Sequence, residues 1–293
     1  MSETAGKQVS HLKQRQDDRD RQEILDSLTR VDYSHEQSGT ILRRRPGTGL
    51  WLLRSPEYQQ WLHSESVTTL FCPGIPGAGK TILASIAVED LSNRFSDSVG
   101  IGVAWVYCNF RRKDSQSARD ILLSLLRQLA QGRPSLPASV VALSQEEKGR
   151  RTPPSVDEVS SALRSVASLY SVVFIVIDAL DELEIQASDR RRETLLMHVL
   201  RLNAETTVKL FATSRHVPDT EVGLGVSLRR EILADPEDIR TYLDGCIPDL
   251  RKCVLASSEL QEEIKVKITS AAEGMYASPA SIKVHTEAQG DPC

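Results

Sequence analysis

The amino-acid sequence predicts a three-layer α/β fold, in which helices cover both faces of a mostly parallel β-sheet. Strand-like and helix-like segments alternate from residue 67 onward, and such alternation is typical of parallel strands joined by helices. The run 172–177 is apolar throughout, as expected for a central strand that is buried on both faces. A glycine-rich run at 74–81 separates the first strand from the first helix of this series.

The glycine-rich run reads G-I-P-G-A-G-K-T and fits the phosphate-binding pattern G-x-x-x-x-G-K-[ST] at every fixed position. Its backbone amides and the N-terminus of the following helix would surround nucleotide phosphates. Lys80 would reach the β- and γ-phosphates, and the Thr81 hydroxyl would be a ligand of Mg²⁺. The alternative is a glycine-rich turn that arose by chance, but its placement between a strand and a helix argues against this. The predicted nucleotide-binding residues are Gly74, Ile75, Pro76, Gly77, Ala78, Gly79, Lys80 and Thr81.

The sequence thus indicates a P-loop NTPase with ATP or ADP and Mg²⁺ as its cofactors, and its parts follow in order. Residues 1–40 form a polar arm, partly helical or disordered, because a weak stripe of apolar residues cannot fold alone. Residues 41–66 lead into the core and pack on it. Within them, Ser55 and Pro56 predict the start of a helix that turns Tyr58, Trp61 and Leu62 to one side.

Residues 67–233 form the NTPase core. Its predicted strands are 67–72, 101–110, 172–177 and 208–213, with a weaker strand at 226–232. Amphipathic helices between the strands are indicated by apolar residues at helical spacing, which include Ile121, Leu122, Leu125, Val159, Leu163, Leu195 and Val199.

Two further segments follow the core. Residues 234–276 begin with a helix start at Asp235 and Pro236 and form an incomplete helical subdomain. Residues 277–293 show no periodicity, so we expect a disordered tail.

A cluster of acids follows the buried strand in the run D-A-L-D-E at 178–182. Ligands bind at the carboxyl ends of strands in open α/β sheets, so Asp178 is predicted to hold Mg²⁺ together with Thr81. Asp181 or Glu182 would orient or deprotonate an attacking water. The alternative is an acidic loop that only ends a strand.

An arginine follows the next predicted strand. Arg215, at the end of L-F-A-T-S-R, would sense the γ-phosphate and stabilise charge in the transition state, the alternative being a surface arginine in a loop. Its neighbour His216 is a weaker candidate, which we expect to be solvated. The guanine-reading sequence N-K-x-D is absent, which weakly favours adenine.

Composition restricts the partners. The net charge of −4 implies no basic excess over a whole face, so we expect no nucleic-acid partner. The N-terminus lacks an apolar signal segment, and the longest apolar run is too short to cross a bilayer, so we expect no membrane partner. The five cysteines form no C-x-x-C pair, which favours a reduced, cytoplasmic location without a structural metal site.

In this order, the motifs resemble the fungal NACHT-type signalling NTPases of the STAND class, whose core is related to the nephrocystin-type N-terminal region. The resemblance covers about residues 31–276. It rests on the segments 46–53, 71–81, 107–110, 122–129, 178–182 and 213–215.

The resemblance implies a conformational switch in signal transduction. ADP would hold a closed monomer, and ATP with Mg²⁺ would favour an open form that self-associates through the NTPase domain. Hydrolysis would be slow, so the enzymatic activity is at most that of a weak ATPase. Members of the family commonly carry an effector and repeats that sense a ligand, but the sequence does not reveal the upstream ligand.

The chain departs from the family pattern near its end. The run 273–276 resembles the family's G-M-F box, but the expected aromatic continuation is replaced by A-S-P-A-S, so the chain looks C-terminally truncated. Two alternative functions follow: a non-hydrolysing nucleotide-bound scaffold, or a truncated inactive remnant. A small-molecule kinase or an ordinary motor ATPase is a further alternative, disfavoured because no acceptor lid is evident.

Overall fold

The computed structural model describes residues 2–65, 68–112, 116–149, 153–183, 190–216, 224, 228–249 and 252–271. Four predicted features lie wholly or partly outside these ranges: the start of the first strand at Val67, the first two residues of the weaker strand at 226–232, the run 273–276 and the tail 277–293.

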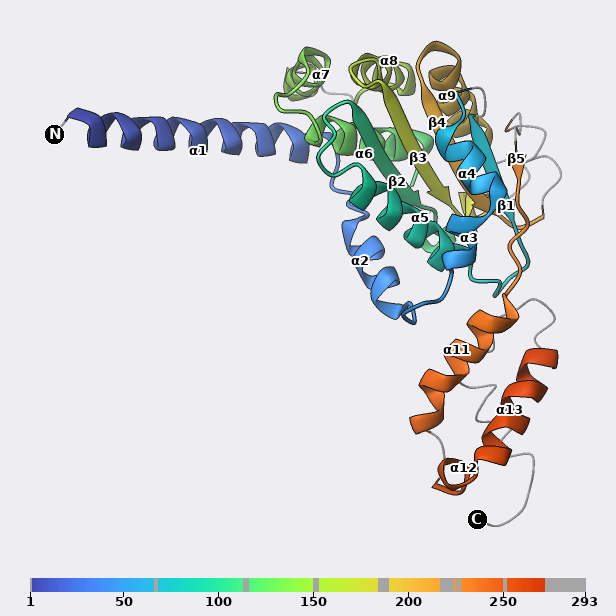
Figure 1. The fold of residues 1–293 in the computed structure, drawn as a ribbon. Helices are drawn as coiled ribbons and strands as arrows, with labels where there is room; N and C mark the ends of the chain where they lie inside the picture. The colour runs from blue at the N-terminus through green and yellow to red at the C-terminus, as the bar shows by residue number, and fades with distance from the viewer. Residues whose placement is uncertain are drawn as a thin grey trace. The chain divides into compact units, whose positions relative to one another are not determined.

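Five strands form one sheet in the spatial order β2-β3-β4-β1-β5 (Figure 1). Strand β1 pairs in parallel with β4 on one side and with β5 on the other. This parallel sheet with flanking helices confirms the predicted α/β fold class. The strands are β1 (Thr69–Pro73), β2 (Ile101–Tyr107), β3 (Val172–Asp178), β4 (Val208–Ser214) and β5 (Leu228–Arg229).

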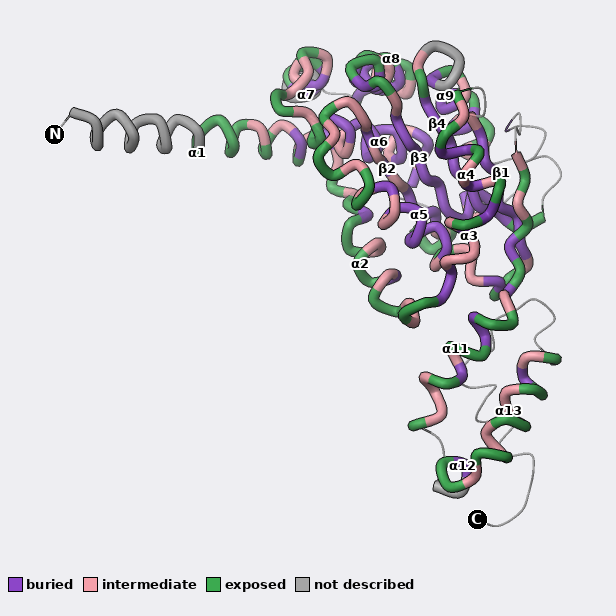
Figure 2. The backbone as a smooth tube through the Cα atoms, in the orientation of Figure 1, coloured by how far each residue is buried: buried purple, intermediate pink, exposed green. Residues whose placement is uncertain are grey.

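The centre of the sheet is the most deeply buried part of the chain (Figure 2). Every residue of β1 and β4 is buried, and so is every residue of β3 after the first. This confirms that the apolar run 172–177 is a strand covered on both faces. Strand β2 instead alternates between buried and half-buried residues, as expected of a strand at the edge of the sheet.

The chain divides into two compact units. The first comprises Met1–Tyr33, Phe95–Ile175 and Glu182–Lys209. In it, Ser117 and Ser155 begin helices with reciprocal capping boxes, in which the serine hydroxyl accepts from the third helical amide. Its helices are α1 (Ser2–Leu28), α6 (Ala118–Gln131), α7 (Ala138–Gly149), α8 (Val156–Ala167) and α9 (Arg191–Glu205).

The last turns of α1 pack against the rest of the first unit. Leu25 and Leu28 are buried, and the Arg21 guanidinium donates to the carbonyls of Gln131 and Pro134 at 2.9 and 2.8 Å. A cation at these carbonyls stabilises the C-terminal end of α6. This part of the polar arm is therefore tied to the core by apolar and charged contacts.

The second unit comprises Ser34–Arg94, Val176–Asp181 and Leu210–Cys293. Helix α4 begins as predicted, with the Ser55 hydroxyl accepting from the Tyr58 amide at 3.2 Å and Pro56 in the first turn. The Trp61 ring is fully buried, with its centroid 5.9 Å from that of Phe211 in β4. The helices before and after β1 are α2 (Ser34–Arg43), α3 (Leu50–Arg54), α4 (Pro56–His63) and α5 (Lys80–Arg94).

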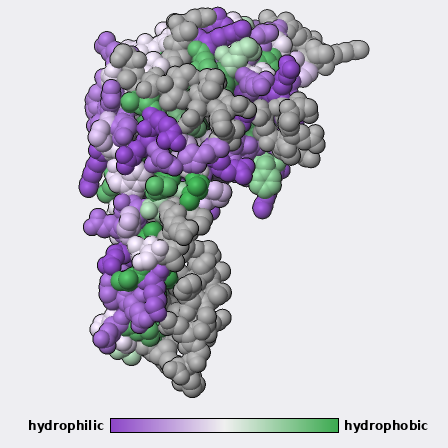
Figure 3. Space-filling view, turned by 90° about the vertical axis from the view of Figure 1, so that its right-hand side faces the viewer, coloured by the Kyte–Doolittle hydropathy of each residue, from purple (hydrophilic) through white to green (hydrophobic). Residues whose placement is uncertain are grey.

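Three helices end the described part of the second unit: α11 (Pro236–Cys246), α12 (Lys252–Ala256) and α13 (Ser258–Ala271). Helices α11 and α13, with Ala234 before α11, form a small apolar core of Ala234, Ile239, Leu243 and Ile268. Asp235 caps α11 by accepting from the amides of Glu237 and Asp238. On the face in Figure 3, hydrophobic residues form small, separate groups among hydrophilic ones. Within the described residues, no helix combines the length and apolar character needed to cross a bilayer.

We expect Trp61→Ala to lower the free energy of unfolding by about 3–5 kcal/mol, because it removes a fully buried ring from the contact between α4 and β4. Denaturant unfolding measures this change. Leu42→Ala is the control, because Leu42 is 83% exposed and its loss should change stability by less than about 0.5 kcal/mol. A loss below about 1 kcal/mol for Trp61→Ala would show that α4 does not anchor on the sheet.

Candidate functional site

The predicted phosphate-binding loop starts where β1 ends. The Gly74 amide donates to the Ser214 carbonyl of β4 at 3.1 Å, and Gly74 forms a parallel bridge with Ile232. A Cβ atom at position 74 would lie 2.5 Å from the Ile232 carbonyl oxygen. Only glycine therefore fits between these two backbones.

Two glycines give the loop its turn. Gly77 and Gly79 have φ angles of +78° and +84°, in the left-handed region that favours glycine. The Ala78 amide donates to the Ile75 carbonyl at 3.3 Å, and the Ala78 side chain is fully buried. The loop is thus a folded turn that is fixed by the buried side chain of Ala78.

Lys80 is the first residue of α5. Its ammonium group donates to the carbonyls of Gly74 and Ile75 at 2.8 and 2.9 Å, so its charge lies over the loop that precedes it. The next residue, Thr81, is exposed and presents its hydroxyl in the first turn of the helix. An ammonium group and a helix N-terminus together favour an anion at this position.

Asp178 ends β3 and is only 2% exposed. Its Oδ1 accepts a hydrogen bond of 2.5 Å from the Thr213 hydroxyl of β4. The same hydroxyl accepts from the Ala179 amide at 2.9 Å. Ala179 has a φ of +56°, a left-handed conformation that is strained for a residue other than glycine. The two hydrogen bonds of Thr213 therefore hold the strained end of β3 in place.

Asp181 and Arg215 form an ion pair with two hydrogen bonds. The Arg215 amide donates to Asp181 Oδ1 at 2.9 Å, and its Nε donates to Oδ2 at 2.5 Å. Burial alone would raise the pKa of Asp181, but the hydrogen bonds and charge of Arg215 outweigh it, so this pKa is lowered. The Asp181 carboxylate is buried while the Arg215 side chain is 57% exposed. Asp181 thus fixes the backbone amide and the Nε atom of Arg215 and leaves part of the arginine side chain exposed.

Glu182 belongs to the first unit. Its Oε2 accepts from the Phe110 amide at 3.2 Å, and its side chain is half-buried. The neighbouring candidate His216 is exposed and lies 3.0 Å from Glu231, so it is solvated and paired with an acid.

The structure brings most of the predicted residues of the second unit to one edge of the sheet. The pairing of β1 with β4 aligns Pro73 with Ser214, which places the loop beside Arg215, and Thr213 links the same strand end to Asp178. Sequence reasoning assigned no role to Thr213. A hydroxyl one residue before the end of a strand, beside a strand that ends in an acid, is the signal that could have found it.

The candidate magnesium ligands are the side chains of Asp178 and Thr81. Asp178 supplies a carboxylate, and Thr81 supplies an exposed hydroxyl. Mg²⁺ prefers oxygen ligands and is usually held by one or two protein groups together with phosphate oxygens and waters. This donor set fits Mg²⁺.

The chain resembles one protein-family model and several solved structures. The family model described as Nephrocystin 3, N-terminal matches residues 47–215, which is more than half of the chain. These residues include the loop, the acids after β3 and Arg215. No curated protein matches the sequence at a significant level.

Solved structures resemble the chain only distantly. They include the ORC1 protein of Aeropyrum pernix in complex with DNA, at 20% identity over 86% of this chain and 65% of that chain, with a TM-score of 0.42. The Aeropyrum pernix ORC2 protein has 18% identity over 84% of this chain and 62% of that chain, with a TM-score of 0.47. A Walker-type ATPase of Pyrococcus abyssi has 14% identity over 80% and 66%, with a TM-score of 0.49. The chain therefore spans less than two thirds of the length of each of these proteins.

One expectation is corrected by these comparisons. The net charge predicted that nucleic acid is not a partner, but one of the similar structures is an ORC1 protein bound to DNA. The physical reason is that a net charge sums over the whole chain and does not give the sign of any one face. The net charge therefore does not exclude nucleic acid as a partner.

The Asp181–Arg215 pair should make stability depend on pH. Because the pKa of Asp181 is lower in the folded chain than in the unfolded chain, the pair stabilises the fold above the unfolded pKa of about 4. That contribution is lost as the pH falls through the folded pKa. We expect Asp181→Asn to cost about 1 kcal/mol at neutral pH and progressively less below pH ~4.

Denaturant unfolding of both proteins at several pH values measures this difference. Asp97→Asn, at an exposed position, is the matched control and should change stability little at any pH. An Asp181→Asn effect of the same size at neutral and acid pH would contradict the assignment.

Proposed function

The chain belongs to the nephrocystin 3 N-terminal family, and on that premise we propose that it is a Mg²⁺-dependent module that binds ATP and ADP and hydrolyses ATP slowly. The observation that carries the proposal is the edge where β1 enters a loop with two left-handed glycines and Lys80 opens α5. Asp178 ends β3 and Arg215 follows β4, the strand between β3 and β1. Backbone amides, an ammonium group and a helix N-terminus are the donors that a polyphosphate requires.

Thr81 and Asp178 would hold Mg²⁺ in this proposal. When bound, the ion would neutralise charge on the phosphate oxygens. Lys80 would turn from the carbonyls of Gly74 and Ile75 toward the phosphates, or share its three donors between them. The Thr213 hydroxyl would keep one oxygen of Asp178 occupied and thereby orient the other.

Arg215 would stabilise charge on the terminal phosphate, and Asp181 would act as its positioning residue. Asp181 is a poor proton acceptor, because its pKa is lowered and both its oxygens accept from Arg215. That property supports slow hydrolysis over rapid turnover. It also favours the second candidate function, a module that binds nucleotide without hydrolysing it. Glu182, whose Oε2 accepts from the Phe110 amide, would be the residue that orients or deprotonates the attacking water.

A role as a NACHT-type conformational switch is supported by contacts inside the second unit. The Asp238 carboxylate of α11 accepts from the Gly49 amide at 2.7 Å, and the bond is buried. A Cβ at position 49 would lie 2.3 Å from Cδ1 of Ile86 in α5, so Gly49 lies directly against the helix that Lys80 opens. Arg45 also donates to the Gly245 carbonyl at 2.8 Å. These contacts would transmit any shift of α5 on nucleotide binding to α11.

We expect Lys80→Ala to weaken ATP binding by at least tenfold, about 1.4 kcal/mol, because the ammonium group over the loop is lost. Isothermal titration calorimetry with Mg²⁺ present measures the dissociation constant. The matched control is Lys267→Ala on α13, where the side chain is 49% exposed. Equal affinity of wild type and Lys80→Ala would refute the proposal, provided that thermal unfolding shows both to be folded.

Arg215→Met tests the hydrolytic part separately. If Arg215 acts only on the transition state, the substitution should lower ATP turnover by about 10²-fold and leave the affinity for ADP within about threefold. Phosphate release under single-turnover conditions measures the rate, and Arg229→Met, in β5, is the control. Turnover that is at background in the wild type, with nucleotide bound tightly, would support the non-hydrolysing module instead.

A further inference from the structure

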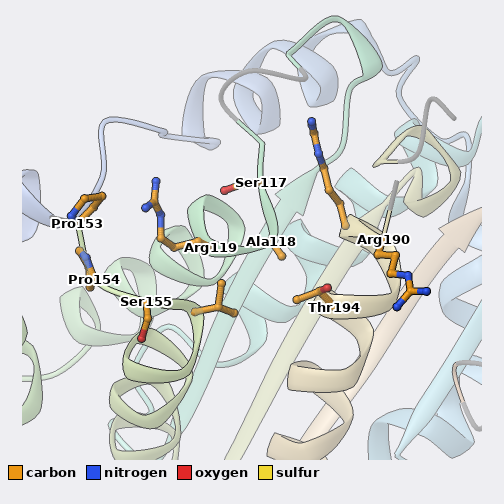
Figure 4. A pocket seen from close by; sticks show the side chains of 10 residues that line it. Ser117, Ala118, Arg119, Pro153, Pro154, Ser155, Arg190 and Thr194 are labelled. Atoms are coloured by element: carbon orange, nitrogen blue, oxygen red, sulfur yellow. The ribbon is translucent and has the colours of Figure 1, made fainter. Parts of the chain in front are cut away.

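A pocket of about 630 Å³ lies in the first unit (Figure 4), and its lining includes no residue of the loop at 74–81. Helices α6, α8 and α9 all begin at this pocket. Its volume is within the range of about 300–1,000 Å³ that is usual for small-molecule sites. The pocket is lined by Ser117, Ala118, Arg119, Pro153, Pro154, Ser155, Val156, Arg190, Arg191 and Thr194.

Among the residues that the structure describes, three arginines and no acid line the pocket. Arg119 comes from the first turn of α6, whereas Arg190 and Arg191 come from the start of α9. Figure 4 shows Arg119 and Arg190 on opposite sides, with Ser117 and Thr194 between them. The formal charge of the lining is therefore +3, contributed by two segments that are about 70 residues apart in the sequence.

Two acids that follow lining residues in the sequence complete the capping boxes of α6 and α8. Asp120 Oδ2 accepts from the Ser117 amide at 3.0 Å and from the Ser117 hydroxyl at 2.6 Å. Glu158 Oε2 accepts from the Ser155 amide at 2.8 Å. Arg119 Nη2 lies 3.6 Å from Asp120 Oδ1, which is too far for a hydrogen bond. These two carboxylates complete the capping boxes of α6 and α8, and Asp120 is also the ion-pair partner of Arg119.

One donor at the pocket is unsatisfied. The Nε atom of Arg119 is buried and has no hydrogen-bond partner among the described residues, although the side chain as a whole is 34% exposed. A buried donor without an acceptor is unfavourable, and such donors are rare in folded proteins. Helix α9 adds to this, because its first turn has no side-chain cap and its amides favour an anion.

We propose that this pocket binds an organic phosphate, as a second anion site distinct from the loop at 74–81. Guanidinium groups bind phosphate oxygens with two parallel hydrogen bonds, which suits Arg119 and Arg190. The hydroxyls of Ser117, Ser155 and Thr194 can contact further oxygens. Pro153, Pro154 and Val156 offer an apolar wall to the carbon skeleton of the ligand. A phosphate group with an organic substituent fits both parts of the lining.

The probe is phenyl phosphate, and the experiment uses the full chain carrying Lys80→Ala, so that the proposed nucleotide site does not compete. Saturable binding, measured by calorimetry, should weaken by at least about tenfold in Arg119→Gln and in Arg190→Gln. Arg201→Gln, at an exposed position of the same helix α9, should leave it unchanged. Phenol, which lacks the phosphate, should not bind.

Several results would overturn the proposal: no saturable binding of phenyl phosphate, equal binding by phenol, or equal binding by both arginine variants and their parent. If Arg119→Gln does not fold, Arg190→Gln still decides, because Arg190 is exposed. Failure of ATP binding at the loop would leave this result unaffected, because the probe is titrated with Lys80 already removed. A phosphoserine peptide titrated in parallel distinguishes a free small phosphate from a phosphorylated side chain as the source.

Discussion

The parallel pairing of β1 with β4 is the constraint on which the candidate site depends. It aligns Pro73 with Ser214 and continues as the hydrogen bond from the Gly74 amide to the Ser214 carbonyl. The loop with Lys80 therefore begins beside the end of the strand that carries Thr213 and leads to Arg215. Because Thr213 also binds Asp178, a single strand end connects the phosphate loop to the acid of the next strand.

Much of this edge could be predicted from the sequence, because its components are local. The loop has a fixed spacing, and the strand 172–177 is apolar at every position. The helix start at Ser55 and Pro56 follows from capping chemistry within four residues. Strand bounds agreed within about three residues except at β5, whose described part is Leu228–Arg229, followed by a bridge from Ile232 to Gly74. The mixed sequence of this segment carries little periodicity.

The contacts between strands could not be predicted in the same way. Asp181 and Arg215 were each expected to face a substrate, yet they bind each other across 34 residues of sequence. Nothing in local periodicity gives the strand order that brings them together. The pairing changes their chemistry, since an acid with a lowered pKa that holds an arginine is better suited to positioning than to accepting a proton.

The local distribution of charge could not be predicted from the net charge either. A net charge of −4 coexists with a pocket whose described lining holds three arginines and no acid. Arg190 and Arg191 line the same pocket as Arg119, which is about 70 residues away in the sequence. The three arginines come together through the packing of α6, α8 and α9, and amino-acid composition carries no information on that packing.

The most direct test of the central claim is a crystal structure of the full chain with Mn²⁺ and a non-hydrolysable ATP analogue, with the ion located by its anomalous scattering. The account predicts a single Mn²⁺ peak bound by Thr81 and Asp178, with the Lys80 ammonium group contacting the terminal phosphates. Phosphates bound away from residues 74–81, or an ion that does not contact Asp178, would contradict it.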